Sequence, residues 1–200
     1  MIGKRRLDRA LGMIGAEPRA AEVRVRWRVF QLNPSMPPEG MDRAAYLAAK
    51  FGGAARASEI YRAIRSEGST EGIHFAFERI KRTPNTLKGH GLIRAAEESG
   101  FDHAMVERLF CAYFLEGRDI GDGAVLRNLA EEVGLPDADI TACLADEADL
   151  GILVAEDVGA RASGISGVPY FLIDGRYSLA GAVPAEVLVR ALQLAGQAVS

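Results

Sequence analysis

The stretch SGISGVPYFLIDGRYSLAGA, from Ser163 to Ala182, decides how the rest of the chain is interpreted. It predicts a Gly-rich loop, a Val168-Pro169 bond, a strand over 170–173, a turn at Asp174-Gly175 and a return strand over 177–180. Proline at the start of a strand removes no ladder hydrogen bond, and a cis peptide bond costs least before proline. We therefore predict a β-hairpin that follows a cis Val168-Pro169 bond.

Hydrophobic periodicity predicts helices along most of the remaining chain. The predicted helices cover residues 1–14, 42–51, 57–66, 86–99, 102–116, 123–133, 138–164 with a break near Gly151, and 184–194. Residues 22–32, EVRVRWRVFQL, alternate instead between apolar and mostly arginine side chains. This period of two predicts one half-buried strand.

The order of the predicted elements is helix, strand, helical block, hairpin and helix. A lone strand cannot form a sheet by itself, so we expect the strand over 22–32 to join the distant hairpin across the helical block. The sequence thus predicts an α/β domain made of residues 1–40 and 165–200. Residues 41–164 are predicted to be a helical insertion into that domain.

Composition excludes several classes of function. A chain of 200 residues with 48% hydrophobic content can bury a core, and a net charge of −3 offers no basic stripe for nucleic acid. No apolar run approaches the roughly 20 residues of a membrane-spanning helix. Asp8 and Arg9 interrupt what would have to be the apolar part of a signal peptide. We expect a cytoplasmic protein without a nucleic-acid or membrane partner, in an oligomeric state that the sequence leaves open.

The sequence contains two cysteines, Cys111 and Cys143. Neither belongs to a Cys-x-x-Cys pair or lies at a metal-ligand spacing. We interpret them as unpaired structural thiols, with a mutual disulfide or a redox-sensing role as the alternatives. No metal and no cofactor are expected.

Five segments spread along the chain carry a resemblance to a known family. They are IGKRRLDRAL (2–11), RWRVFQLNP (26–34), RTPNTLKGHGLIRAA (82–96), LFCAYFLEGRDIGD (109–122) and GVPYFLIDGRYSLAGA (167–182). In this order they resemble the cytoplasmic DsbA-family oxidoreductases of the FrnE type. The resemblance implies thiol–disulfide exchange and an α/β fold in which a thioredoxin-like sheet carries a large all-helical insertion.

At its start, the sequence departs from the pattern of this family. In the FrnE type, IGKRR follows a first strand and a Cys-Pro-Trp-Cys-Tyr run, so Met1 stands where the tyrosine would be. The first central strand and both redox cysteines are therefore absent from these 200 residues. Because a missing central strand leaves buried backbone groups unpaired, at about 1–3 kcal/mol each, we expect a truncated record of a longer protein. The cysteine pair is expected just before Met1, and this 200-residue chain is expected to be inactive in redox exchange.

The sequence and the resemblance together suggest substrate-binding residues and no catalytic residue within the chain. The candidates are Gly167, Val168, Pro169, Asn85, His90 and Arg94. A cis bond before Pro169 would leave the backbone of Val168 free to pair with an extended substrate. Thr86 is the expected N-cap of a helix that carries His90 and Arg94 on one stripe, where they can orient an anionic substrate.

Three functions stay open at this point. The leading hypothesis is thiol–disulfide exchange with a peptide or glutathione as substrate. Glutathione is also the candidate co-substrate. The same fold serves kappa-type glutathione transferases and 2-hydroxychromene-2-carboxylate isomerases, in which a serine commonly replaces the attacking cysteine. The third hypothesis is a non-catalytic module that binds peptides with the Pro169 loop.

Overall fold

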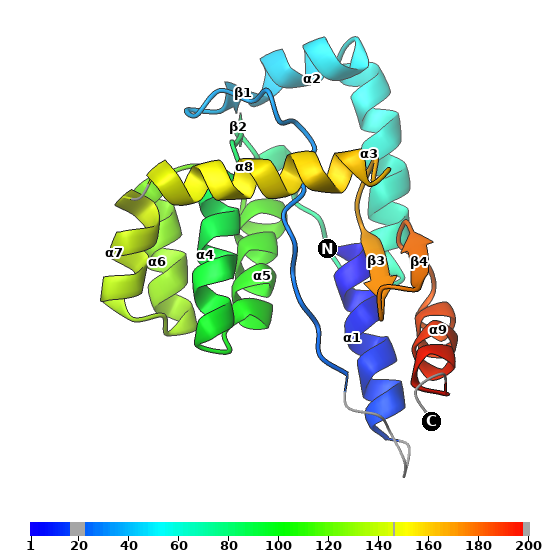
Figure 1. Cartoon of the computed structure of the whole chain (residues 1–200). Coiled ribbons are helices and arrows are strands. Elements are labelled where there is room, and N and C mark those ends of the chain that lie inside the picture. Colours follow the sequence, from blue (N-terminus) through cyan, green and yellow to red (C-terminus); the bar gives the residue numbers. More distant parts are fainter. Residues whose placement is uncertain (17–22, 146, 198–200) are drawn as a thin grey trace. The chain divides into compact units, whose positions relative to one another are not determined.

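The structure is a computed structural model that describes residues 1–16, 23–145 and 147–197 (Figure 1). Its helices are α1 (Ile2–Gly15), α2 (Arg43–Phe51), α3 (Ala54–Ser69), the 3-10 turn η1 (Phe77–Arg79), α4 (Leu87–Glu98), α5 (Asp102–Cys111), the π-helical turn η2 (Ala112–Glu116), α6 (Gly123–Val133), α7 (Asp137–Ala145), α8 (Glu147–Ala162) and α9 (Ala185–Gln197). Its strands are β1 (Met41–Asp42), β2 (Arg82–Thr83), β3 (Tyr170–Ile173) and β4 (Tyr177–Ala180).

The chain divides into two compact units, and each is described by itself. The terminal unit contains residues 1–26 and 161–200, and the central unit contains residues 27–160. In the terminal unit, α1 buries Leu7, Ala10 and Ile14, which are three or four residues apart, and packs against α9. The hairpin contributes Ile173, which forms an apolar cluster with two alanines of α9. The two helices and the hairpin thus bury one another's apolar sides.

The hairpin lies where the sequence predicts it. β3 and β4 pair antiparallel, with Tyr170 opposite Ala180 and Ile173 opposite Tyr177. Asp174 and Gly175 adopt positive φ angles of 52° and 67° at the turn. Aspartate and glycine tolerate this conformation better than other residues, so the Asp-Gly pair directs the chain to reverse here. The Val168-Pro169 bond is cis, as predicted.

The central unit is almost entirely helical. Helices α4 to α7 share a core in which Leu92, Met105, Leu126, Leu129 and Ile140 are fully buried. Stacked rings of Phe75 and Phe77, with Phe114 at their edge, fasten η1 to η2. The two-residue strands β1 and β2 pair antiparallel beside this group. Among the helices that the structure describes, none is both long and apolar enough to cross a bilayer.

The predicted strand over 22–32 is not formed. Glu22 lies outside the described residues, and none of residues 23–32 is assigned to a strand. The alternation of half-buried and exposed side chains is nevertheless present from Val23 to Val29. Near the end of the segment, the backbone N–H of Gln31 donates to a side-chain oxygen, Asp157 Oδ1, at 2.7 Å. The periodicity therefore predicted the alternating burial of this segment correctly. The prediction that the segment pairs as a strand is wrong for residues 23–32.

Two predicted helices also differ from the structure. The helix over 138–164 is divided between α7 and α8, and α8 continues through Gly151, so the predicted break near Gly151 is wrong. The predicted helix over 102–116 changes at Ala112 from α-helix to a π-helical turn, which Gly117 ends in the left-handed conformation. The remaining predicted helices are present, with ends that differ by a few residues.

Candidate functional site

A cavity of about 300 Å³ lies beside the loop that precedes β3 in the terminal unit. It is lined by Gly164, Ser166, Gly167, Val168, Pro169, Tyr170, Ala180 and Gly181. This lining contributes two hydroxyl groups, those of Ser166 and Tyr170, and carries no charged side chain. Three predicted site residues, Gly167 to Pro169, are therefore brought together on one wall. A lining of this kind offers shape and backbone groups, but no charge, to a ligand.

The start of α1 closes one side of the Pro169 loop. A Cβ atom on Gly3 would lie 2.6 Å from Pro169 Cγ and 2.9 Å from Pro169 Cβ, closer than carbon atoms approach. Glycine at this position lets the helix contact the proline ring directly. Sequence reasoning missed this role of Gly3, because nothing local distinguishes a close-contact glycine from any other helical glycine.

Val168 presents backbone groups that the described chain leaves unpaired. The N–H of Gly181 donates to the carbonyl of Pro169 at 2.8 Å, so the hairpin ladder extends one residue beyond β3. Within residues 1–16, 23–145 and 147–197, neither the N–H nor the C=O of Val168 has a hydrogen-bond partner. The residue is 47% exposed. An extended ligand chain can therefore pair with Val168 as an added strand would.

The basic first turn of α1 is tied into the terminal unit. The ammonium group of Lys4 donates to Asp8 Oδ2 at 2.8 Å, and its side chain is nearly fully buried. Arg6 donates to the carbonyl of Ala182, just past the end of β4. The first turn contains no acidic residue, so the positive end of the helix dipole is not offset there. The Arg6 bond holds the helix start against the segment that follows β4, whereas the Lys4–Asp8 pair lies within α1.

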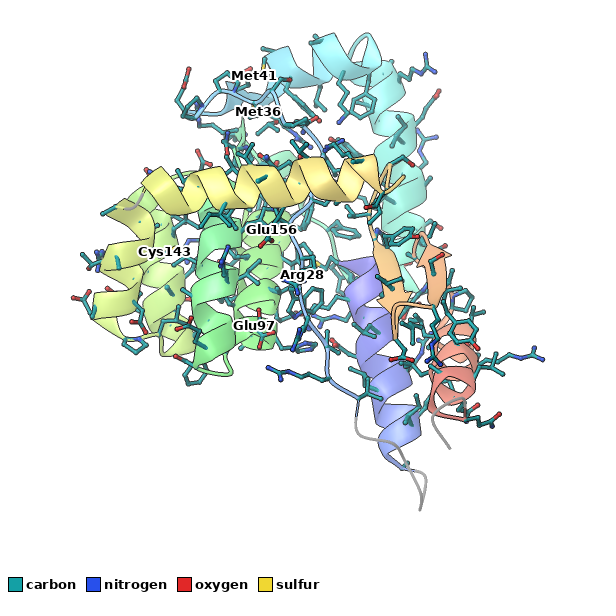
Figure 2. The ribbon with its side chains drawn as sticks, viewed as in Figure 1. Arg28, Met36, Met41, Glu97, Cys143 and Glu156 are labelled. Carbon is teal, nitrogen blue, oxygen red and sulfur yellow. The ribbon has the colours of Figure 1, made fainter. Side chains whose placement is uncertain are left out.

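The other three predicted site residues belong to the central unit, and Asn85 has a structural role there. Its Nδ2 donates to the carbonyl of Met36 at 2.8 Å, and its Oδ1 accepts from the N–H of Leu87 at 3.0 Å (Met36 is labelled in Figure 2). Thr86 occupies the N-cap position as predicted, but its side chain makes no capping hydrogen bond. Asn85 caps α4 in its place and joins it to the loop before β1.

His90 packs inside the central unit. Burial lowers the pKa of its imidazole, while the nearby Asp157 carboxylate and a hydrogen bond to the backbone of Phe30 act in the opposite direction. With the bond from Gln31 to Asp157, these contacts hold the extended segment before Leu32. They are those of a structural histidine.

The free energy of unfolding should decrease as the pH is lowered, because His90 becomes protonated on unfolding. Because its folded-state pKa is lowered, the unfolded chain binds the proton more readily below the ordinary value of 6.5. Stability from neutral His90 is complete above that value and is lost as the pH falls. Denaturant titrations at about pH 7.5 and 5.5 should show a loss of about 1 kcal/mol that His90→Gln removes and exposed His74→Gln retains. Equal losses in His90→Gln and the wild type would contradict this assignment.

Arg94 lies on the exposed side of α4, where it forms an ion pair with Glu156 of α8 at 3.5 Å. Both side chains are substantially exposed, so the pair contributes little to stability. Asn85, His90 and Arg94 share α4 or its start, but their side chains bind different neighbours. In the central unit, therefore, they do not converge on a common ligand position.

Both cysteines are half-buried thiols of the central unit, and neither forms a disulfide with a described residue. Figure 2 shows Cys143 on α7, where its sulfur lies 2.9 Å from the position of a Cβ on Gly91. The thiol of Cys111 donates to Glu107 Oε1 at 3.3 Å. The described residues contain no group of three or more His, Cys, Asp and Glu side chains that could hold a metal ion.

Three comparisons with known proteins agree with this architecture. Residues 1–193 match the model of a family described as DSBA-like thioredoxin domain. The chain is 26% identical over 198 residues, 96% of its length and 88% of the relative, to the uncharacterized protein YwbO of Bacillus subtilis (strain 168). It is also similar to the crystal structure of the probable DsbA oxidoreductase SCO1869 from Streptomyces coelicolor. That similarity has a TM-score of 0.83 and 30% identity, and covers 98% of this chain and 84% of the other.

Proposed function

Because the chain belongs to the DSBA-like thioredoxin domain family, we propose that it is a FrnE-type member that binds a thiol or disulfide substrate at the Pro169 loop. The observation that carries this proposal is the unpaired backbone of Val168 beside a cavity of about 300 Å³. Gly3 brings the first turn of α1 against the same loop, which supports a binding surface that includes the helix start. The segments quoted above support the FrnE assignment.

An extended peptide is the substrate that this surface favours. The residues that line the cavity carry no charge, so inside it the carboxylates of glutathione meet no cationic side chain. A polypeptide can instead form main-chain hydrogen bonds with Val168 and place its own side chains in the cavity. A peptide with a cysteine or a disulfide satisfies both the surface and the chemistry of the family.

Redox exchange by these 200 residues is not part of the proposal. Attack on a disulfide needs an accessible thiolate, and a second thiol must then resolve the mixed disulfide. The two half-buried cysteines lie in different surroundings, with Cys111 bound to Glu107 and Cys143 against Gly91. We propose that they are structural and that the chain binds its substrate without oxidising or reducing it.

Disulfide reduction by the purified chain should therefore be no faster than reduction by free thiols at the same concentration. An insulin reduction assay with dithiothreitol as the electron source measures this rate. Cys111→Ser and Cys143→Ser should leave the rate unchanged. Rapid turnover that either substitution abolishes would show that one of these thiols is the nucleophile.

Two substitutions of Val168 test the binding proposal. Val168→Pro removes the N–H donor, while Val168→Ala shortens the side chain and keeps the donor. Because this N–H has no partner in the described chain, neither substitution removes an internal hydrogen bond. Calorimetric titration with a cysteine-containing peptide should show about tenfold weaker binding for Val168→Pro and a small change for Val168→Ala.

The same titration separates the alternatives. Thermal melting of both variants checks that the fold is retained. Equal affinity of the two variants for the peptide would show that the N–H of Val168 does not bind the peptide. Binding of glutathione without binding of the peptide would favour the glutathione transferase or isomerase chemistry, and peptide binding that is independent of the cysteine would favour a general peptide-binding module.

A further inference from the structure

Two cations of α2 lie on a shared tyrosine ring in the central unit. The guanidinium carbon of Arg43 is 5.6 Å from the centre of the Tyr46 ring, and Lys50 Nζ is 5.3 Å from the same point. Arg43 also lies 5.5 Å from the centre of the Tyr61 ring. The rings attract the two positive charges, but they do not neutralise them.

The hydrogen-bond acceptors around these cations are all neutral. Nη1 of Arg43 donates to Thr83 Oγ1 at 3.0 Å and to the Tyr113 hydroxyl at 3.3 Å, and Nη2 donates to the Tyr61 hydroxyl. Nε of Arg43 is buried and makes no hydrogen bond. Lys50 donates to Asn33 Oδ1 at 2.8 Å. No carboxylate of the described chain lies within ion-pair distance of Arg43 or Lys50.

Two of the tyrosines that accept from Arg43, Tyr61 and Tyr113, keep their protons and so remain neutral. Burial raises the pKa of Tyr113 to about 12, and burial also raises the pKa of Tyr61 above its ordinary value. Several other arginines of this unit have acidic partners: Arg65 pairs with Glu78, Arg108 with Glu116 and Glu132, and Arg127 with Asp137. The two cations on Tyr46 thus form a positive cluster that the described chain leaves uncompensated.

We propose that Arg43, Tyr46 and Lys50 form a binding site for an oxyanion, a carboxylate or a phosphate group. Lys50 is exposed, and Arg43 and Tyr46 are half-buried, so a ligand can reach this face from solvent. Asn33 Oδ1 now accepts from both Lys50 and the Tyr46 hydroxyl, the latter at 3.1 Å. An oxyanion accepts the same donors in stronger, charge-assisted hydrogen bonds and compensates both cations. This site lies in the central unit and is independent of the proposed function of the Pro169 loop.

Titration with inorganic phosphate and, separately, with acetate tests the site at constant ionic strength. Saturable binding of either anion, with a shift of the Arg43 guanidinium signals in NMR spectra, is the expected result. Lys50→Gln should weaken binding about tenfold, and Tyr46→Phe, which keeps the ring, should weaken it about threefold. Lys81→Gln, which removes an exposed lysine of the same unit, should bind like the wild type.

Two results would overturn the proposal. One is the absence of saturable binding of both anions up to the highest concentration at which the protein stays folded. The other is equal affinity of Lys50→Gln and Lys81→Gln, because general attraction to positive charge would then explain the binding. Lys50 is exposed and its substitution leaves the core intact, so a loss of binding in this variant reports on the site rather than on folding.

Discussion

Replacing Gly117 by alanine should lower the free energy of unfolding of the central unit by about 2–5 kcal/mol. Gly117 has a φ angle of 74°, which costs an alanine about 1–2 kcal/mol. A Cβ atom there would also lie 2.7 Å from the backbone carbonyl carbon and oxygen of Arg79. Backbone atoms of η1 cannot yield as a flexible side chain can, so η2 and its aromatic contacts must shift. Denaturant titration with a far-UV signal measures the loss.

Gly134→Ala is the matched control for this prediction. Gly134 ends α6 with a φ angle of 95°, but a Cβ atom there would meet nothing within 4 Å. This variant therefore has the unfavourable backbone conformation without the collision. It should lose clearly less stability than Gly117→Ala, and equal losses in the two variants would contradict the close contact with Arg79.

Replacing Gly3 by alanine should destabilise the terminal unit by about 1–3 kcal/mol and weaken peptide binding. The added methyl group would overlap the Pro169 ring, which is rigid and cannot rotate away. Either α1 or the Pro169 loop must then move, and both border the proposed site. Thermal or denaturant unfolding and peptide titration together measure the two effects.

Gly12→Ala separates this collision from the general effect of alanine in a helix. Gly12 lies in α1 as well, and a Cβ atom there would meet nothing within 4 Å. Alanine is favoured over glycine inside helices, so this variant should gain about 0.5–1 kcal/mol. The account would be wrong if Gly3→Ala were stabilised like Gly12→Ala and bound peptide as the wild type does.

Local sequence patterns predicted the elements whose formation is determined by their own residues. The hairpin follows from the Asp174-Gly175 pair, and most helices follow from apolar residues three or four positions apart. The segment over 22–32 shows the limit of this reasoning. Its alternating pattern reports which side chains are buried, whereas its pairing depends on Asp157, a residue more than 120 positions away. The two-residue strands β1 and β2 are too short to have a period.

The features of the candidate site also fall into those that local sequence predicts and those that it does not. The position of Gly167 to Pro169 in a loop before a strand could be predicted, because a Gly-rich loop and an X-Pro bond are local features. The contact of Gly3 with Pro169 could not, since it joins residues that are far apart in the sequence. The helical spacing suggests His90 as a ligand-binding residue, and the family resemblance suggests Asn85. Their partners in the structure, Met36 for Asn85 and Phe30 for His90, lie on distant segments that spacing does not reveal.

Amide hydrogen exchange at Val168 tests the central claim most directly. The free chain should exchange this N–H rapidly, because the residue is exposed and the group has no partner in the described chain. Saturation with a cysteine-containing peptide should protect it, while the N–H of Gly181, which already donates to Pro169, should change little. Protection of Val168 on binding is the result that the account predicts. Peptide binding that leaves the exchange of Val168 unchanged would contradict it.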